Sequence, residues 1–195
     1  MFNRNSAALG RSPDFFVSAK TSTAIRARHP ALREALVQAS LDPAVRSIGF
    51  VASAPAASGQ VEVDAVVVQR DDGRYLLDVV PARRPDDGGL QREALRGLGL
   101  PPLVVTSEDL RAEPRRSNVD LVWSHHGRGV ALDLRLCILQ VLVDDGPLRL
   151  GQLLQRVRTD REPAAAVMSL ACADLLEIDL TSDRIGPATL VRSRS

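Results

Sequence analysis

The first half of the chain combines one helical pattern with several strand-like runs. Between Pro30 and Asp42, apolar side chains recur at helical spacing, which predicts an amphipathic helix. Runs rich in valine, isoleucine and leucine follow, and they predict three strands, over residues 45–52, 61–68 and 75–80. Asp71-Asp72-Gly73 lies between the last two runs and is typical of a tight hairpin turn.

A second helix and a fourth strand complete this half of the chain. The pattern predicts the helix over residues 89–98 and the strand over residues 103–106. The order helix, three strands, helix, strand favours a mixed sheet flanked by helices. We therefore expect an α/β domain over residues 13–112, preceded by a flexible N-terminus over residues 1–12.

The second half changes character after a polar, proline-containing segment. Residues 113–129 are interpreted as a linker and connecting strand. Three helical patterns follow, and then two short strand candidates: residues 130–143, 150–157, 161–176, 177–180 and 188–192. Three helices followed by a hairpin form the arrangement of a winged helix-turn-helix domain, which we expect over residues 130–195.

Composition excludes several classes of protein. A hydrophobic content of 45% over 195 residues is enough for a packed core, and the net charge of +1 gives no global attraction to nucleic acid or membrane. The chain opens without a secretory signal and has no apolar run of membrane-spanning length. We therefore expect a cytoplasmic protein without a membrane partner. The 25 lysine plus arginine residues include one lysine, Lys20, and hence 24 arginines.

Several short segments of the first domain carry the most specific local sequence. They are Ser18-Ala19-Lys20, Leu41-Asp42-Pro43-Ala44-Val45, Val63-Asp64-Ala65-Val66, Asp72-Gly73-Arg74-Tyr75-Leu76-Leu77-Asp78-Val79-Val80-Pro81 and Val104-Val105-Thr106-Ser107-Glu108-Asp109-Leu110. Spread over residues 12–111, they resemble the TnsA-like transposon endonucleases. Arg116-Ser117-Asn118 and the region after it match the build of that family's second domain. The resemblance implies a restriction-endonuclease-like PD-(D/E)XK domain followed by a winged helix-turn-helix domain.

The same resemblance implies a set of catalytic groups that this chain carries only in part. The family has an acid on the second strand and an acid-x-lysine triplet on the third, and the acids bind a divalent metal that activates water. Asp64 and Asp78 stand at the two acidic positions, but Val80 replaces the lysine. A helix-borne glutamate of the family falls near Leu32, and Glu34 is the nearby acid. Asp64, Asp78 and Glu34 are therefore vestigial candidates.

Two interpretations of the first domain follow. In one, the nuclease fold is catalytically degenerate, needs no cofactor and is kept for contact with DNA or protein. In the other, the protein is an active Mg²⁺-dependent DNA endonuclease with Asp64 and Asp78 as metal ligands. Arg83 or Arg84 could reach toward the site, but a guanidinium stays protonated and cannot take a proton from water.

In the second domain, the third helix is the expected DNA-reading element. It is poor in arginine, asparagine and glutamine, so it offers few contacts to base edges. The expected DNA-binding residues are therefore mostly phosphate contacts: Arg149, Arg156, Arg158, Arg161, Ser169 and Arg184. A flat, alanine-rich helix also suits contact with another protein chain, through Ala165, Met168 and Cys172.

The sequence thus favours a protein that binds double-stranded DNA, as a regulator or as a subunit of a mobile-element assembly. The first alternative is the metal-dependent endonuclease. The second is a protein–protein interaction scaffold, with a protein partner or a second copy of the chain as its ligand.

Overall fold

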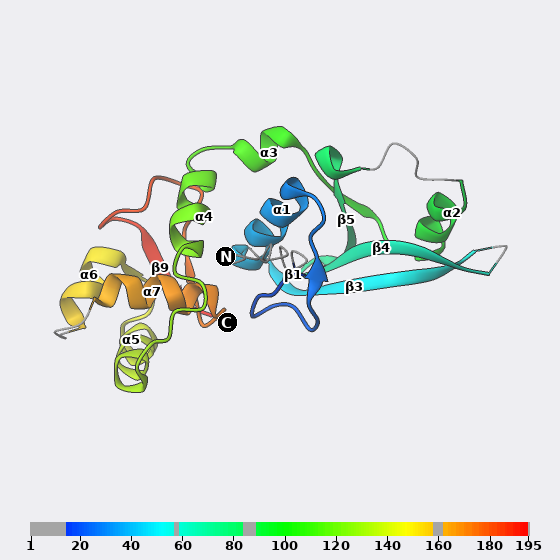
Figure 1. Ribbon diagram of the computed structural model, residues 1–195. Coiled ribbons are helices and arrows are strands. Elements are labelled where there is room, and N and C mark those ends of the chain that lie inside the picture. Colours follow the sequence, from blue (N-terminus) through cyan, green and yellow to red (C-terminus); the bar gives the residue numbers. More distant parts are fainter. Residues whose placement is uncertain (1–14, 57–58, 84–88, 158–161, 195) are drawn as a thin grey trace, which may run out of the picture.

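The computed structural model describes residues 15–56, 59–83, 89–157 and 162–194 (Figure 1). The expected N-terminus over residues 1–12 lies outside these residues, as do Arg84, Arg158 and Arg161. The architecture is α/β, with a mixed sheet at one end of the molecule and a group of helices with a small sheet at the other (Figure 1). The expected α/β class is confirmed.

The larger sheet of the described residues follows the predicted order of elements. Helix α1 (Pro30–Leu41) precedes the strands β3 (Val45–Ala56), β4 (Gly59–Arg70), β5 (Gly73–Val79) and β6 (Pro102–Val105). They lie side by side in the order β3-β4-β5-β6, and the first two pairings are antiparallel while β5 and β6 are parallel. The sheet is therefore mixed, as the order of elements predicted.

The first hairpin is longer than the hydrophobic pattern indicated. Strand β3 continues beyond Ala52 to Ala56, and Pro55 and Ala56 pair with Gln60 and Gly59. Backbone pairing extends here past the valine-rich run, and Ala54 of the extension is buried. Helix α2 (Gly89–Gly97) covers this extension and buries Ala94 against it.

The expected linker and connecting strand over residues 113–129 is wrong, because helix α4 (Arg115–Trp123) lies there. A short helix, α3 (Ser107–Arg111), leads into it. The start of α4 is polar and exposed, which explains its linker-like sequence. Its other face buries Val119 and Val122, three residues apart, and this burial makes the segment helical.

After α4, the remaining described elements are three helices and three short strands. They are α5 (Leu132–Asp145), β7 (Leu148–Arg149), α6 (Leu150–Arg156), α7 (Pro163–Cys172), β8 (Leu176–Ile178) and β9 (Leu190–Ser193). The three strands form an antiparallel sheet in the order β7-β9-β8. Among the described residues, no helix combines the length and the apolar character that crossing a membrane requires.

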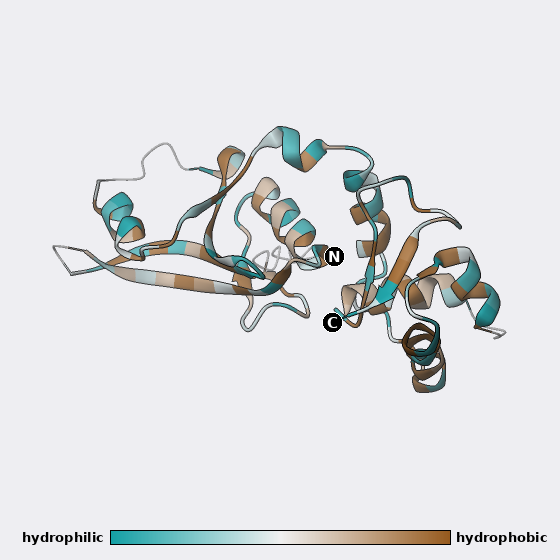
Figure 2. Cartoon of the chain, turned by 180° about the vertical axis from the view of Figure 1, so that it is seen from behind, coloured by the Kyte–Doolittle hydropathy of each residue, from teal (hydrophilic) through white to brown (hydrophobic). Residues whose placement is uncertain are grey.

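Helix α7 lies at the centre of a core that both halves of the chain share. All residues from Ala165 to Cys172 are buried, and α1, α4, α5 and α6 pack around this helix. One continuous cluster of buried side chains runs from Phe16, in the short strand β1 (Phe15–Phe16), to Val191 in β9. Figure 2 shows hydrophobic positions both in the strands of the larger sheet and in the helices of the other half. The two halves are fused through apolar packing.

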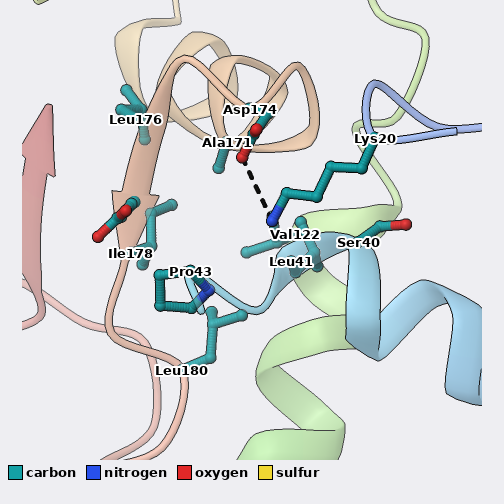
Figure 3. A pocket seen from close by; sticks show the side chains of 11 residues that line it. Lys20, Ser40, Leu41, Pro43, Val122, Ala171, Asp174, Leu176, Ile178 and Leu180 are labelled. Carbon is teal, nitrogen blue, oxygen red and sulfur yellow. Dashed lines mark ion pairs between the residues drawn. The ribbon is translucent and has the colours of Figure 1, made fainter. Parts of the chain in front are cut away.

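Polar groups join the two halves beside this core. Arg194, after β9, donates from Nη1 to the carbonyl oxygen of Pro43 at 2.6 Å and from Nη2 to that of Val45 at 3.0 Å. The same side chain pairs with Glu177 at 2.7 Å. Lys20 reaches the same region from the N-terminal segment (Figure 3). Apolar contacts are non-directional, so they do not by themselves fix how the two halves are oriented. The directional hydrogen bonds beside the core fix this orientation.

Candidate functional site

A cavity of about 470 Å³ opens beside the middle strands of the larger sheet. Its wall combines the segment before α1 with β4, β5 and α2, and apolar side chains form part of its lining. The charged side chains that line it are Arg26, Arg28, Asp64, Asp78, Arg83 and Arg92. Asp64 and Asp78, which the sequence placed on adjacent strands, thus reach one cavity.

Asp64 sits at an irregularity in the first hairpin. Its φ of 46° lies in the left-handed region, and the pairing register between β3 and β4 shifts between Val51 and Ser53. A non-glycine residue in this conformation costs on the order of 1 kcal/mol. Its carboxylate pairs with Arg28, whose Nη1 lies 2.9 Å from Oδ2. The ion pair with Arg28 therefore holds the first acid at a strained backbone position.

Asp78 is engaged by a second arginine from the same cavity. Arg83 donates from Nε to Oδ1 at 2.8 Å, and its Nη2 donates to Oδ2. The chain returns within five residues because Val80–Ala82 form a turn of 3₁₀-helix directly after β5. The hydrogen bond with Asp78 raises the pKa of the Arg83 guanidinium further above its ordinary value. This arginine therefore stays charged and acts as a hydrogen-bond donor.

Neither Glu34 nor Lys20 belongs to this cavity. Glu34 of α1 pairs with Arg116 of α4, with 3.8 Å between Oε1 and Nε. Lys20 lies at the junction of the two halves, on a separate pocket. Glu34, the third vestigial candidate, therefore lies outside the cavity, because its position on α1 directs it toward α4.

The donor set of the cavity does not fit a divalent cation. A hard cation such as Mg²⁺ needs several oxygen ligands, but both carboxylates already bind a guanidinium. Over the described part of the chain, no three histidine, cysteine, aspartate or glutamate side chains gather in a way that could hold a metal. Each of the two carboxylates of the cavity is thus paired with an arginine.

In the second half, the expected DNA-reading helix faces inward. Ser169, one of the expected DNA contacts, is 5% exposed, and its hydroxyl donates to the carbonyl oxygen of Arg128 at 2.5 Å. In this arrangement Ser169 cannot contact DNA, so this expectation is corrected. Helix α7 is rich in alanine and other apolar residues, and it buries them against the chain itself.

The expected arginine contacts divide into three groups. Arg149 and Arg184 are exposed, on β7 and on the loop between β8 and β9. Arg156 is also exposed, and its Nη1 binds Oδ2 of Asp145 at 2.6 Å. Arg158 and Arg161 lie outside the described residues. The described arginines of this half can contact phosphate but do not form a base-reading helix face.

The apolar face expected to meet a protein partner is also occupied internally. Ala165, Met168 and Cys172 are all buried within the chain. Sequence reasoning instead missed the outer side of α5, where Leu132 and Val143 are 67% and 68% exposed. Leu136 lies four residues after Leu132 and seven before Val143, and it is also exposed. These helical spacings were the sequence signal for an exposed apolar strip. The helix lies at the lower edge of the molecule (Figure 2).

The chain was compared with family models and with curated proteins. No family model matches the chain, and no curated protein matches it.

Proposed function

We propose that the protein binds double-stranded DNA without cutting it, as a regulator or as a subunit of a mobile-element assembly. In this proposal, the first half is a degenerate nuclease-like domain of the TnsA type. One observation carries the proposal: Asp64 and Asp78 share one cavity, and an arginine binds each of them. Such a cavity favours an anionic ligand and lacks the free acids that metal-dependent cleavage needs.

The order of the elements supports both halves of the proposal. A helix, a three-stranded antiparallel run, a second helix and a parallel fourth strand agree with a restriction-endonuclease-like core. In the second half, the order α5-β7-α6-α7-β8-β9 supports the proposed winged helix-turn-helix. Because α7 is buried, this winged helix would contact DNA through exposed arginines and the backbone phosphates.

The decisive experiment combines a cleavage assay with a gel shift. The full chain is incubated with plasmid DNA and Mg²⁺ or Mn²⁺, and the same DNA is run beside it in a mobility-shift gel. We expect a shift that weakens steeply as salt rises, without nicking or linear product. Cleavage that Asp78→Ala abolishes would establish the endonuclease instead. Absence of both shift and cleavage would contradict DNA binding and favour the interaction scaffold.

A paired substitution tests how the second half takes part. Arg149→Ala removes an exposed charge, whereas Ser169→Ala removes a buried hydroxyl. We expect Arg149→Ala to weaken DNA binding and to reduce the salt dependence. Ser169→Ala is expected to leave the affinity unchanged. A loss of affinity in Ser169→Ala alone, with thermal stability retained, would contradict an inward-facing α7.

A further inference from the structure

The cavity beside β4 and β5 holds more basic than acidic side chains. Arg26, Arg28, Arg83 and Arg92 line it together with Asp64 and Asp78. We propose that these arginines bind phosphodiester oxygens of duplex DNA, and that the two aspartates are counter-charges that limit the affinity. The proposal rests on the function proposed above, and it names the ligand group and the residues that control its binding.

The depth of each group in the cavity supports these roles. The side chains of Asp64 and Asp78 are 20% and 25% exposed, whereas those of Arg28 and Arg83 are 42% and 52% exposed. Each acid therefore lies deeper than the arginine that it binds. A ligand that enters from solvent meets the guanidinium groups first, with the carboxylates behind them.

The hydrogen-bonding capacity of arginine allows one guanidinium to serve both an acid and a phosphate. A guanidinium has five N–H donors, and the two-point contact between Arg83 and Asp78 uses two of them. About three donors remain for another acceptor. The carboxylate meanwhile holds the guanidinium in a fixed orientation, so an incoming phosphate does not need to order a free side chain.

The negative charges of the acids lower the affinity for phosphate, and this opposes the gain from a fixed guanidinium orientation. Each aspartate cancels one positive charge. Glu62 adds a further acid beside the pair of Arg28 and Asp64, with 3.8 Å between its Oε1 and Nη2 of Arg28. Replacement of aspartate by asparagine removes the charge but keeps a carbonyl oxygen that accepts from the same arginine. Such a change should therefore strengthen DNA binding, whereas loss of a ligand weakens a metal-dependent site. The two kinds of site respond with opposite signs.

The experiment measures the affinity of the full chain for a fluorescent DNA duplex by anisotropy, in EDTA and at several salt concentrations. We expect Asp64→Asn and Asp78→Asn each to bind about threefold to tenfold more tightly than wild type, with a steeper salt dependence. Arg28→Gln and Arg83→Gln are expected to bind more weakly by a similar factor. Thermal unfolding of each variant verifies that it is folded.

Asp120→Asn is the matched control, because it makes the same charge change at an exposed position of α4. If the two cavity variants bind no more tightly than Asp120→Asn, the inference fails while DNA binding by the protein stands. If the wild-type chain binds no duplex at all, the proposed function fails as well. These two failures are therefore distinguishable.

Inorganic phosphate distinguishes a DNA backbone from a small phosphate ligand. At equal ionic strength, phosphate is expected to displace the duplex no better than chloride, because a free ion engages few of the arginines at once. Displacement by phosphate alone at concentrations where chloride has no effect would assign the cavity to a small anion and overturn its assignment to DNA.

Discussion

The ammonium group of Lys20 lies 3.3 Å from Oδ1 of Asp174, the residue that follows α7 and its C-cap (Figure 3). It also donates to the carbonyl oxygen of Asp42, at 2.7 Å. One side chain thus connects the N-terminal segment, the end of α1 and the end of α7. The single lysine of the chain is a structural residue that joins the two halves.

Replacement of this lysine should destabilise the fold. Lys20→Ala leaves a space where a side chain only 2% exposed had been, and it removes a partner from Asp174. We expect a loss of about 2–4 kcal/mol in the free energy of unfolding, measured with denaturant. Lys20→Met is the control, since it fills most of the volume and should lose less. A loss under about 0.5 kcal/mol in Lys20→Ala would contradict the structural role.

The same lysine should alter stability at alkaline pH. Burial lowers the pKa of Lys20 below 10.5, and the charges of Asp174 and Asp42 only partly oppose this effect. Between the lowered pKa and 10.5, the unfolded chain holds a proton on Lys20 that the folded chain has lost, so stability rises with pH. We expect the stability of wild type relative to Lys20→Met to increase over this range. Denaturant titrations at a series of pH values measure the difference, and a decrease would contradict it.

Asn118 of α4 should be the most sensitive polar residue of the second half. Its Nδ2 donates to the carbonyl oxygens of Leu180 and Asp183, at 3.0 and 2.7 Å, and its Oδ1 accepts from the backbone of Ile185 at 2.9 Å. Asn118→Ala leaves these groups without a partner, and we expect a loss of about 2–4 kcal/mol in denaturant unfolding.

Asn118→Asp sharpens this test, because it keeps the shape of the side chain. The carboxylate faces two carbonyl oxygens and cannot donate to them, so the variant should be no more stable than Asn118→Ala at neutral pH. Stability equal to wild type in either variant would contradict the role of Asn118 in holding the loop between β8 and β9.

The two cysteines should differ sharply in reactivity. Burial raises the pKa of Cys172 to about 12, and its thiol contacts the carbonyl oxygen of Val122, whereas Cys137 is exposed on α5. Because the thiolate is the reactive form, a thiol reagent at neutral pH should label one site in the folded protein and two in denaturant. Cys137→Ser removes the fast site. Rapid labelling of folded Cys137→Ser would contradict the burial of Cys172.

Asp179 should stabilise the protein only above acidic pH. Hydrogen bonds from Ser182 and Thr181 lower its pKa to about 2. The folded state therefore favours the carboxylate, and its contribution is present above the unfolded pKa and lost as pH falls through about 2. We expect Asp179→Ala to cost roughly 1 kcal/mol at pH 7, by comparison with the loss of a helix cap.

Denaturant unfolding over an acidic series checks this pH dependence. The difference between wild type and Asp179→Ala should be constant above about pH 5 and should shrink toward pH 2. Asp183→Ala, at an exposed position on the same loop, is the control variant. A difference that grows as pH falls would contradict the assignment.

Local signals in the sequence were sufficient for most of the first half. Apolar periodicity predicted α1, and valine-rich runs on either side of Asp71-Asp72-Gly73 predicted β4 and β5. These patterns work because burial of one helix face, or pairing across a tight turn, depends on residues close together in the chain. The failure at α4 has the opposite cause, since Val119 and Val122 are buried by contacts with distant elements.

In the candidate site, too, the sequence predicted the local features but not the contacts between distant residues. The sequence predicted that Asp64 and Asp78 lie close together on neighbouring strands, and both line one cavity. It did not indicate that Arg28, 36 residues before Asp64, or Arg83, beyond a 3₁₀ turn, would bind them. Such pairings depend on the register of the sheet and on the path of the chain around it.

The sequence by itself determined the α/β class, the order of elements along the first half of the chain, the apolar nature of α7 and the presence of one lysine. Only the tertiary structure decided that α7 faces inward, that the two halves share one core, and that Lys20 joins them beside Asp174. Hydrophobic periodicity specifies which side of an element is buried but not which partner covers it. That choice depends on long-range packing and on polar contacts between segments far apart in the chain.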